Sequence, residues 1–253
     1  MDFFELKNIS ERFIDIINPS SPEKMIKIGE ILSLHTGSRV IDFGCGFGEV
    51  LALWGEHFGI TGVGIDIREY ACQRARQRII KANLDEKIEI ICANVAKYPV
   101  DQHASDVAIC TGASFIWDDF GGALRALSTA VHKEGKIVIG EPYWLSDEIP
   151  PEYRQRMNEV HSEYGLLHRM RKQGLELEYL VRASIDNWDS YEAGNWYGLV
   201  RWIEENPHHP ERELVVEHLR QRQDEYLHYG RQYLGWAIYV LGFEHSDQIT
   251  IDE

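Results

Sequence analysis

The strongest constraint on the fold is a glycine-rich turn that follows an apolar run and precedes a helical pattern. The turn is Asp42-Phe43-Gly44-Cys45-Gly46-Phe47-Gly48, the apolar run spans Ser38 to Phe43, and apolar residues at helical spacing begin at Val50. Glycines at such a turn let the backbone approach a ligand closely, and the following helix aims its N-terminal amides at that ligand. The pattern therefore predicts a strand–turn–helix unit that binds a small molecule.

Strands and helices alternate after this turn. Short runs rich in β-branched residues predict further buried strands at Ile60 to Ile67, Ile88 to Val95, Asp106 to Cys110 and Lys136 to Gly140. Apolar residues at helical spacing lie between them. We therefore expect an α/β fold with at least five parallel strands.

The flanking regions predict more helices and two further strands. Helices are expected at Phe4 to Ile17 and Pro22 to Leu34, where they could cover a cofactor cleft. After Trp144 we expect a long helix from Pro151, helices from Asp189 to Tyr229, and strands near Leu175 to Ile185 and Gly235 to Leu241. The length and 44% hydrophobic content fit one domain over residues 1–253: covering helices in 1–35, a cofactor-binding core in 36–145, and a cap with the last two strands in 146–253.

The charge balance argues against nucleic acid and membranes as partners. The chain has 26 Lys and Arg and 41 Asp and Glu, so the net charge is 26 − 41 = −15, which repels DNA, RNA and anionic lipid surfaces. Five basic residues in Arg68 to Lys81 are expected to form a solvated helix face. No stretch approaches the ~20 apolar residues of a membrane span and no signal sequence is evident, so we expect a cytoplasmic protein. The cysteines and histidines have no metal-ligand spacing, so no metal is expected, and the oligomeric state is left open.

Acidic residues around the turn narrow the choice of ligand. A dinucleotide-binding turn needs a small residue at position 49, where Glu49 would repel a pyrophosphate. Asp66 lies 66 − 46 = 20 positions after Gly46, where a carboxylate can accept hydrogen bonds from both ribose hydroxyls. Asp42 is suited to a cationic ligand group. These residues favour S-adenosylmethionine, which has a ribose, a sulfonium and an amino group but no phosphate.

The motifs resemble those of the class I S-adenosylmethionine-dependent methyltransferases. Val40 to Gly48 is similar to the first motif of that family and Val63 to Ile67 to the second. The similarity continues through Asn94-Val95, Asp106 to Thr111 and Lys133 to Val138, so it covers about residues 35 to 145. Segments around Glu141 to Trp144, Trp188 to Glu192 and Arg231 to Trp236 resemble a little-characterised bacterial and archaeal branch of small-molecule methyltransferases, which implies no particular acceptor.

The resemblance implies a Rossmann-like fold with a seven-stranded, mostly parallel sheet and helices on both faces. It also implies S-adenosylmethionine as cofactor and S-adenosylhomocysteine as product. Where the family often has an acid that accepts the adenine amine, this chain has Asn94, a weaker acceptor. The residues expected to bind the cofactor are Asp42, Phe43, Gly44, Gly46, Gly48, Asp66, Ile67, Asn94, Val95 and Thr111.

Residues for the acceptor are sought at the carboxyl ends of strands and in the aromatic C-terminal part. Glu141 and Tyr143 are candidate catalytic residues, with Glu141 either accepting a proton or making structural hydrogen bonds. An apolar stripe of Ala193, Trp196, Tyr197, Val200 and Ile203 predicts the core-facing side of a helix. The candidates for substrate binding are Trp188, Tyr191, Arg201, Arg231 and Tyr233, for which core packing or solvent exposure is the alternative.

The sequence thus favours methyl transfer from S-adenosylmethionine to a small molecule. Three alternatives stay open: a non-catalytic protein that binds an adenosyl ligand, methyl transfer to a protein or RNA, and a nicotinamide-dependent oxidoreductase. Glu49 and the absence of a separate substrate domain disfavour the oxidoreductase.

Overall fold

The protein is built around one twisted sheet, which a computed structural model describes within residues 1–244. The strand order is β3-β2-β1-β4-β5-β8-β7. Strands β3 to β5 of this path are parallel, whereas β8 is antiparallel to both β5 and β7. The strands are β1 (Arg39–Phe43), β2 (Thr61–Asp66), β3 (Ile88–Cys92), β4 (Ser105–Thr111), β5 (Val131–Trp144), β7 (Leu175–Arg182) and β8 (Leu234–Phe243). The predicted Rossmann-like sheet of seven mostly parallel strands is confirmed.

The sheet has one additional element that the sequence did not predict. The two-residue strand β6 (His161–Ser162) pairs in parallel with the end of β5. It interrupts the long helix expected from Pro151, which instead forms two helices, α6 (Pro151–Arg156) and α7 (Glu163–Lys172). The Ser162 side chain caps α7 by accepting the Gly165 N–H, so α7 begins anew after the strand.

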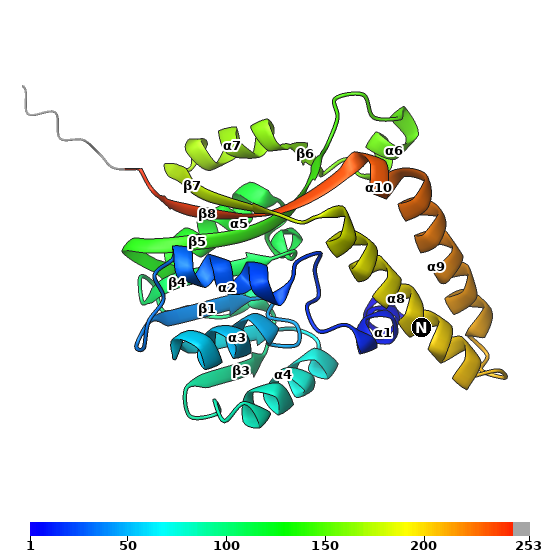
Figure 1. Ribbon diagram of the computed structural model, residues 1–253, viewed down its shortest axis with the longest axis horizontal. Coiled ribbons are helices and arrows are strands. Elements are labelled where there is room, and N and C mark those ends of the chain that lie inside the picture. The colour runs from blue at the N-terminus through cyan, green and yellow to red at the C-terminus, as the bar shows by residue number, and fades with distance from the viewer. Residues whose placement is uncertain (245–253) are drawn as a thin grey trace, which may run out of the picture.

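Helices pack on both faces of the sheet and bury two separate apolar layers (Figure 1). One face is covered by α2 (Pro22–Ile31), α3 (Glu49–Phe58) and α4 (Glu69–Lys81), and the other by α5 (Phe120–Ala130) and α7. Successive residues of the strands alternate between these layers, as the geometry of a strand requires. The sheet is therefore buried on both sides, which explains the continuous apolar runs in the sequence.

A helical cap lies beyond the carboxyl ends of the parallel strands. It consists of α1 (Phe3–Ser10), α8 (Ile185–Glu205) and α9 (Arg212–Glu225), which Figure 1 shows together at the right of the view. The short helices η4 (Tyr226–Gly230) and α10 (Arg231–Tyr233) lead from the cap back into β8. The cap stands over the edge of the sheet at which the glycine-rich turn lies.

One prediction for the cap segments is wrong, and a second holds for only part of its residues. The first helix ends at Ser10, continues as the short helix η1 (Glu11–Phe13), and does not reach Ile17. In α8, Trp196, Val200 and Ile203 of the predicted stripe pack against the apolar cluster of the cap, whereas Ala193 and Tyr197 are exposed. The fully buried positions are Glu192, Asn195 and Leu199, with Gly198. The backbone of α1 approaches α8 so closely that a Cβ on Gly198 would lie 2.3 Å from the Ser10 carbonyl oxygen, so packing against α1 decides which face turns inward.

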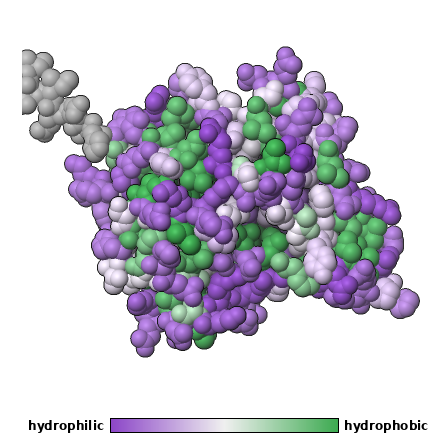
Figure 2. All heavy atoms as spheres, viewed as in Figure 1, coloured by the Kyte–Doolittle hydropathy of each residue, from purple (hydrophilic) through white to green (hydrophobic). Residues whose placement is uncertain are grey.

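Hydrophilic residues cover most of the face seen in Figure 2, with smaller hydrophobic areas among them. Within the part of the chain that the structure describes, no helix is both long and apolar enough to cross a membrane.

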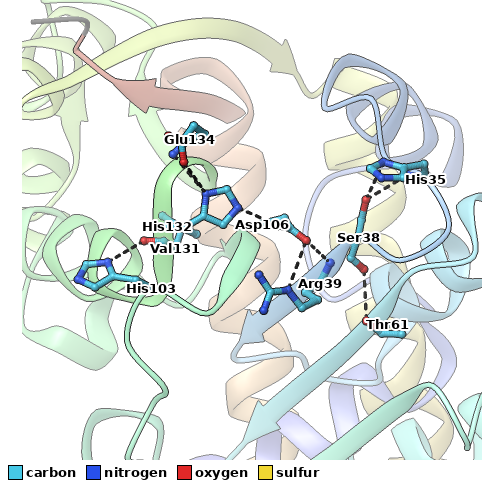
Figure 3. Close-up of polar contacts among 9 residues, drawn as sticks. All are labelled: His35, Ser38, Arg39, Thr61, His103, Asp106, Val131, His132 and Glu134. Atoms are coloured by element: carbon cyan, nitrogen blue, oxygen red, sulfur yellow. Dashed lines mark hydrogen bonds and ion pairs between the residues drawn. The ribbon is translucent and has the colours of Figure 1, made fainter.

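A polar network closes the amino-terminal edge of the sheet, opposite the glycine-rich turn (Figure 3). Its centre is Asp106, whose carboxylate accepts the Arg39 N–H at 2.6 Å and lies 2.8 Å from Nε2 of His132. Burial by itself would raise the pKa of Asp106, but these hydrogen bonds outweigh it and lower that pKa. The carboxylate thus ties the start of β1 to β4 and β5.

We expect Asp106→Ala to lower the free energy of unfolding by about 1 kcal/mol at about pH 7, a value reduced because the side chain is partly exposed to solvent. Since the folded state has the lower pKa, this contribution is complete above the unfolded-state pKa and disappears as the pH falls through the folded-state pKa. Urea unfolding at about pH 7 and about pH 3 measures both effects. A difference between variant and wild type that stays the same at the two pH values would contradict this assignment.

Candidate active site

The glycine-rich turn adopts a backbone conformation that only glycine accommodates easily. Gly44, Gly46 and Gly48 have φ values of +76°, +54° and +69°, in the left-handed region. A Cβ on Gly44 would lie 2.8 Å from Cβ of Ala113, and one on Gly46 would lie 2.7 Å from Cδ1 of Ile17. The turn therefore passes directly beneath the segments that cover it.

Asp66, the last residue of β2, holds this turn in place. Its side chain is 7% exposed. One carboxylate oxygen accepts the Gly46 N–H at 3.0 Å and the other accepts the Arg68 N–H at 2.8 Å. The residue chosen from the sequence as a ribose acceptor is thus also the anchor of the glycine-rich turn.

Arginines of the α4 region tie the N-terminal segment over the turn. Arg68 donates to the fully buried Glu11 at 2.6 Å, and Arg74 donates to the Arg12 carbonyl oxygen at 3.0 Å. The expectation that the stretch Arg68 to Lys81 forms a solvated face is therefore wrong for these arginines. Arg68 and Arg74 bind the N-terminal segment that covers the glycine-rich turn.

Arg78 also attaches the N-terminal segment to α4. It lies beside Glu49, the residue that was expected to repel a pyrophosphate. Its guanidinium lies 2.7 Å from the carboxylate of Asp15 and 2.7 Å from that of Glu49, and it also donates to the Phe47 carbonyl oxygen. Because Arg78, shared with Asp15, offsets part of the charge of Glu49, repulsion of a pyrophosphate by Glu49 is weaker than the sequence indicated.

A cavity of about 400 Å³ opens beside the turn at the carboxyl ends of the strands. We call it the glycine-loop cavity. Among the residues predicted to bind the cofactor, those that line it are Gly44, Gly46, Asp66, Ile67, Asn94, Val95 and Thr111. Other lining residues come from the cap, from the N-terminal segment that follows α1, from the loop after β4, and from single positions before α4 and in η2: Phe3, Phe4, Lys7, Glu11, Ile17, Arg68, Ala96, Gly112, Ala113, Phe115, Ile116 and Tyr191.

The remaining predicted cofactor residues, Asp42, Phe43 and Gly48, do not line this cavity. Phe43 is buried against Trp117, and Gly48 packs on Ala75. Asp42 lines a smaller cavity of about 30 Å³ between the turn and residues 15–18. Burial, and then the nearby Asp66 carboxylate, raise the pKa of Asp42 to about 8.

Asn94 already uses part of its hydrogen-bonding capacity. Its side-chain oxygen accepts the Ala96 N–H at 3.0 Å and so caps the short helix η2 (Val95–Lys97). One lone pair of that oxygen is left for a ligand. The neighbouring Ile67 is 49% exposed at the cavity wall, where it offers an apolar surface.

A second cavity of about 220 Å³ adjoins the first beneath the cap. We call it the aromatic cavity. Ile17, Gly112 and Tyr191 line both cavities. The other residues of its wall are Asn18, Pro19, Pro142, Tyr153, Met157, Trp188, Glu192, Arg222, Glu225, Tyr226, Gly230, Leu234 and Trp236.

Of the five predicted substrate residues, Trp188 and Tyr191 line the aromatic cavity and the other three do not. Arg201 pairs with Glu204 at 2.5 Å on the surface of α8. Arg231 forms a two-pronged ion pair with Asp189. Tyr233 packs near Tyr153 in the cluster behind the cavity.

Glu141 and Tyr143 lie on the opposite face of β5 from the aromatic cavity. They share the face of Ile137 and Ile139, which packs against α5 and α7, whereas Pro142 between them lines the cavity. Burial raises the pKa of Glu141 to about 7, and neither side chain lines either cavity. We therefore correct the expectation from the sequence and give them no role in the transfer.

Several cavity residues were missed from the sequence, namely Asn18, Tyr153, Glu192, Arg222, Glu225 and Tyr226. One signal in the sequence could have identified Glu192 as a cavity residue. It lies four residues after Trp188 and so on the same face of the helix. The others come from η4, from α6, from α9 and from the loop before α2, and nothing in their local sequence marks them.

No group of three or more His, Cys, Asp or Glu within residues 1–244 has the geometry of a metal site.

Comparisons with known proteins agree with this geometry. Residues 41–139 match the family model described as a methyltransferase domain. The chain is 32% identical, over 95% of its length and 99% of the relative, to the uncharacterized protein YjhP of Escherichia coli. It is also 32% identical to a SAM-dependent methyltransferase from Thiobacillus denitrificans solved with S-adenosyl-L-homocysteine, with a TM-score of 0.90 and coverage of 96% and 100% of the two chains. The corresponding enzyme from Geobacter sulfurreducens, also solved with S-adenosyl-L-homocysteine, is 31% identical, with a TM-score of 0.88 and coverage of 95% and 98%.

The chain belongs to the class I S-adenosylmethionine-dependent methyltransferases. The family resemblance stated from the motifs is thereby confirmed, as is S-adenosylmethionine as the cofactor of this methyltransferase. The residues present fit that cofactor: the glycine-loop cavity combines left-handed glycines, the Asp66 carboxylate and the apolar side chains of Ile67 and Val95. The acceptor is a separate question.

We propose that Asp66 both anchors the turn and binds the ribose hydroxyls. Asp66→Ala should then weaken S-adenosylmethionine binding by about 1.5–3 kcal/mol, or roughly 10- to 150-fold, because a charge-assisted acceptor is lost. Titration calorimetry measures the affinity, and Asp85→Ala, at an exposed acid by the opposite edge of the sheet, is the matched control. Unchanged affinity in an Asp66→Ala variant with a normal circular dichroism spectrum would refute the assignment.

Proposed function

We propose that this methyltransferase transfers a methyl group to a small molecule held in the aromatic cavity. The observation that carries the proposal is that the aromatic cavity meets the glycine-loop cavity at Ile17, Gly112 and Tyr191. A methyl donor in one cavity and an acceptor in the other would have their reacting groups at this junction. Small-molecule transfer is favoured over transfer to a protein or RNA because the aromatic cavity is small and lies beneath the cap.

S-adenosylmethionine supplies an electrophilic methyl group on a sulfonium, so the protein needs no nucleophile of its own. The residues of the chain would bind and align the two partners and exclude water. Asp66 would accept the ribose hydroxyls, Ile67 and Val95 would contact the adenine, and Asp42 would face the cationic methionyl part. Trp188 and Tyr191 would position the acceptor.

The N-terminal segment contributes to both cavities in this proposal. Ile17 forms part of the junction, and Asn18 donates from its side-chain nitrogen to Oγ1 of Thr111 at 3.3 Å, at the end of β4. Arg68 and Arg78 hold this segment through Glu11 and Asp15. The segment would exclude water from the junction.

The cytoplasmic location and the single-domain organisation stay predictions.

Filling the aromatic cavity tests the proposal. Met157 lines this cavity and not the glycine-loop cavity, so Met157→Trp should abolish acceptor binding and leave cofactor binding intact. We expect transfer from methyl-labelled S-adenosylmethionine into a low-molecular-weight metabolite extract to fall at least about tenfold, with unchanged affinity for S-adenosylhomocysteine. Met157→Leu, which roughly conserves volume, is the control and should keep its activity. Label found in protein or RNA fractions, or full activity of Met157→Trp, would contradict the proposal.

The raised pKa of Asp42 makes cofactor binding depend on pH. With a pKa of about 8, Asp42 is mostly protonated at about pH 7 in the free protein. A cationic group beside it favours the carboxylate, so binding should release a proton, and the affinity for S-adenosylmethionine should rise several-fold from about pH 6.5 to about pH 8.5. Titration calorimetry measures this rise, and Asp42→Asn should abolish it. Any pH dependence that comes from the ligand itself persists in Asp42→Asn, so an identical profile in both proteins would disprove the role of Asp42.

A further inference from the structure

The aromatic cavity contains a buried carboxylate with a free oxygen. Glu192 is 2% exposed. One of its oxygens accepts the Arg222 guanidinium at 2.8 Å, while the other, Oε2, has no hydrogen-bond partner within residues 1–244. A buried carboxylate oxygen without a partner costs free energy that a hydrogen-bond donor on a ligand would recover. Glu192 therefore offers a ready acceptor for a ligand N–H.

The charged groups of the cavity leave an excess of negative charge. Two carboxylates, Glu192 and Glu225, line it with one cation, Arg222. Arg222 lies 2.8 Å from Glu192 and 4.0 Å from Glu225, so both carboxylates already compete for it. Two further cations lie outside the lining of this cavity: Lys7 pairs with Glu11 at 2.5 Å, and Arg156 lies 5.6 Å from the centre of the Tyr153 ring. An anionic ligand would find no free cation among the lining groups, whereas a cationic ligand would balance the excess charge.

The rest of the wall suits an organic cation. Five aromatic side chains surround the space: Tyr153, Trp188, Tyr191, Tyr226 and Trp236. Aromatic faces attract ammonium groups by cation–π interactions. The Tyr153 hydroxyl and the Trp188 indole N–H, both buried, also have no hydrogen-bond partner among the described residues, so they can bind a second polar group such as a hydroxyl.

We propose that the methyl acceptor is a small organic amine that binds in the aromatic cavity as its ammonium form, with Glu192 as the counter-ion. This inference rests on the proposed function. The volume of about 220 Å³ is below the ~300–1,000 Å³ of sites for drug-sized ligands, so the amine carries at most a single ring or a short chain.

The arrangement also provides the proton transfer that methylation of an amine requires. The bound ammonium gives one proton to Oε2 of Glu192, whose pKa is raised by burial against the opposing effects of Arg222 and Lys7. The nitrogen lone pair then forms the bond to the methyl carbon. The electron pair of the carbon–sulfur bond returns to sulfur, which becomes a neutral thioether, and the methylated nitrogen carries the positive charge. The proton on Glu192 finally leaves to solvent.

Binding of matched probes tests the inference on protein saturated with S-adenosylhomocysteine. Tyramine, tyrosol and 4-hydroxyphenylacetate share one ring and differ in their charged end, being cationic, neutral and anionic. We expect tyramine to bind at least about tenfold more tightly than tyrosol, with 4-hydroxyphenylacetate weakest. Glu192→Gln, which keeps the shape and the acceptor for Arg222, should remove the preference for tyramine, whereas Glu217→Gln at an exposed acid of α9 should keep it.

The outcomes separate this inference from the proposed function. The proposal that the acceptor is an amine would be overturned if tyrosol or 4-hydroxyphenylacetate bound as tightly as tyramine. It would also be overturned if Glu192→Gln kept the preference for tyramine. Absence of binding by every primary amine from methylamine to tyramine would overturn it too. In each of these cases, retained S-adenosylhomocysteine binding and labelling of another small molecule would leave the proposed function standing. The melting temperature of Glu192→Gln with bound S-adenosylhomocysteine verifies that the variant is folded.

Discussion

The cofactor site depends on the buried carboxylate of Asp66. It fixes the glycine-rich turn through the Gly46 N–H and the start of α4 through the Arg68 N–H. Arg68 in turn reaches Glu11 of the N-terminal segment. One charged group at the end of β2 thus connects the turn, a helix and the covering segment, and these contacts define the wall of the glycine-loop cavity.

The N-terminal segment explains why three arginines, Arg68, Arg74 and Arg78, point toward the cofactor site in an acidic protein. The segment from Glu11 to Asn18 crosses the mouth of the site. Apolar contacts hold part of it, since Ile14 lies against Gly194 and Ile17 against Gly46. Charged hydrogen bonds from Arg68, Arg74 and Arg78 hold it there. Such bonds are stronger and more directional than neutral ones, and together with the apolar contacts they keep the segment over the cofactor site.

Local patterns predicted the core well and the cap poorly. The strands from β1 to β4 were found from continuous apolar runs because both faces of the sheet are buried, and the first two motifs were found because glycine and aspartate have few substitutes at those positions. In α8 the apolar stripe was right only in part. Trp196, Val200 and Ile203 pack inward, but Ala193 and Tyr197 are exposed and Glu192 and Asn195 occupy inward positions. A buried polar residue breaks the hydrophobic pattern where a cavity needs it, and in α8 Glu192 does so at the aromatic cavity.

The class of fold, the cofactor and the position of the glycine-rich turn could be inferred from the amino-acid sequence alone. These follow from short-range chemistry: which residues tolerate a left-handed backbone, and which runs can be buried on both sides. Three features became visible only in the folded chain: Glu141 and Tyr143 face away from the aromatic cavity, Arg231 is paired with Asp189, and Glu192 is buried with one oxygen that has no partner among the described residues. The acceptor cavity is assembled from segments far apart in the chain, and the direction of each side chain there is set by packing between helices and strands, which no local pattern encodes.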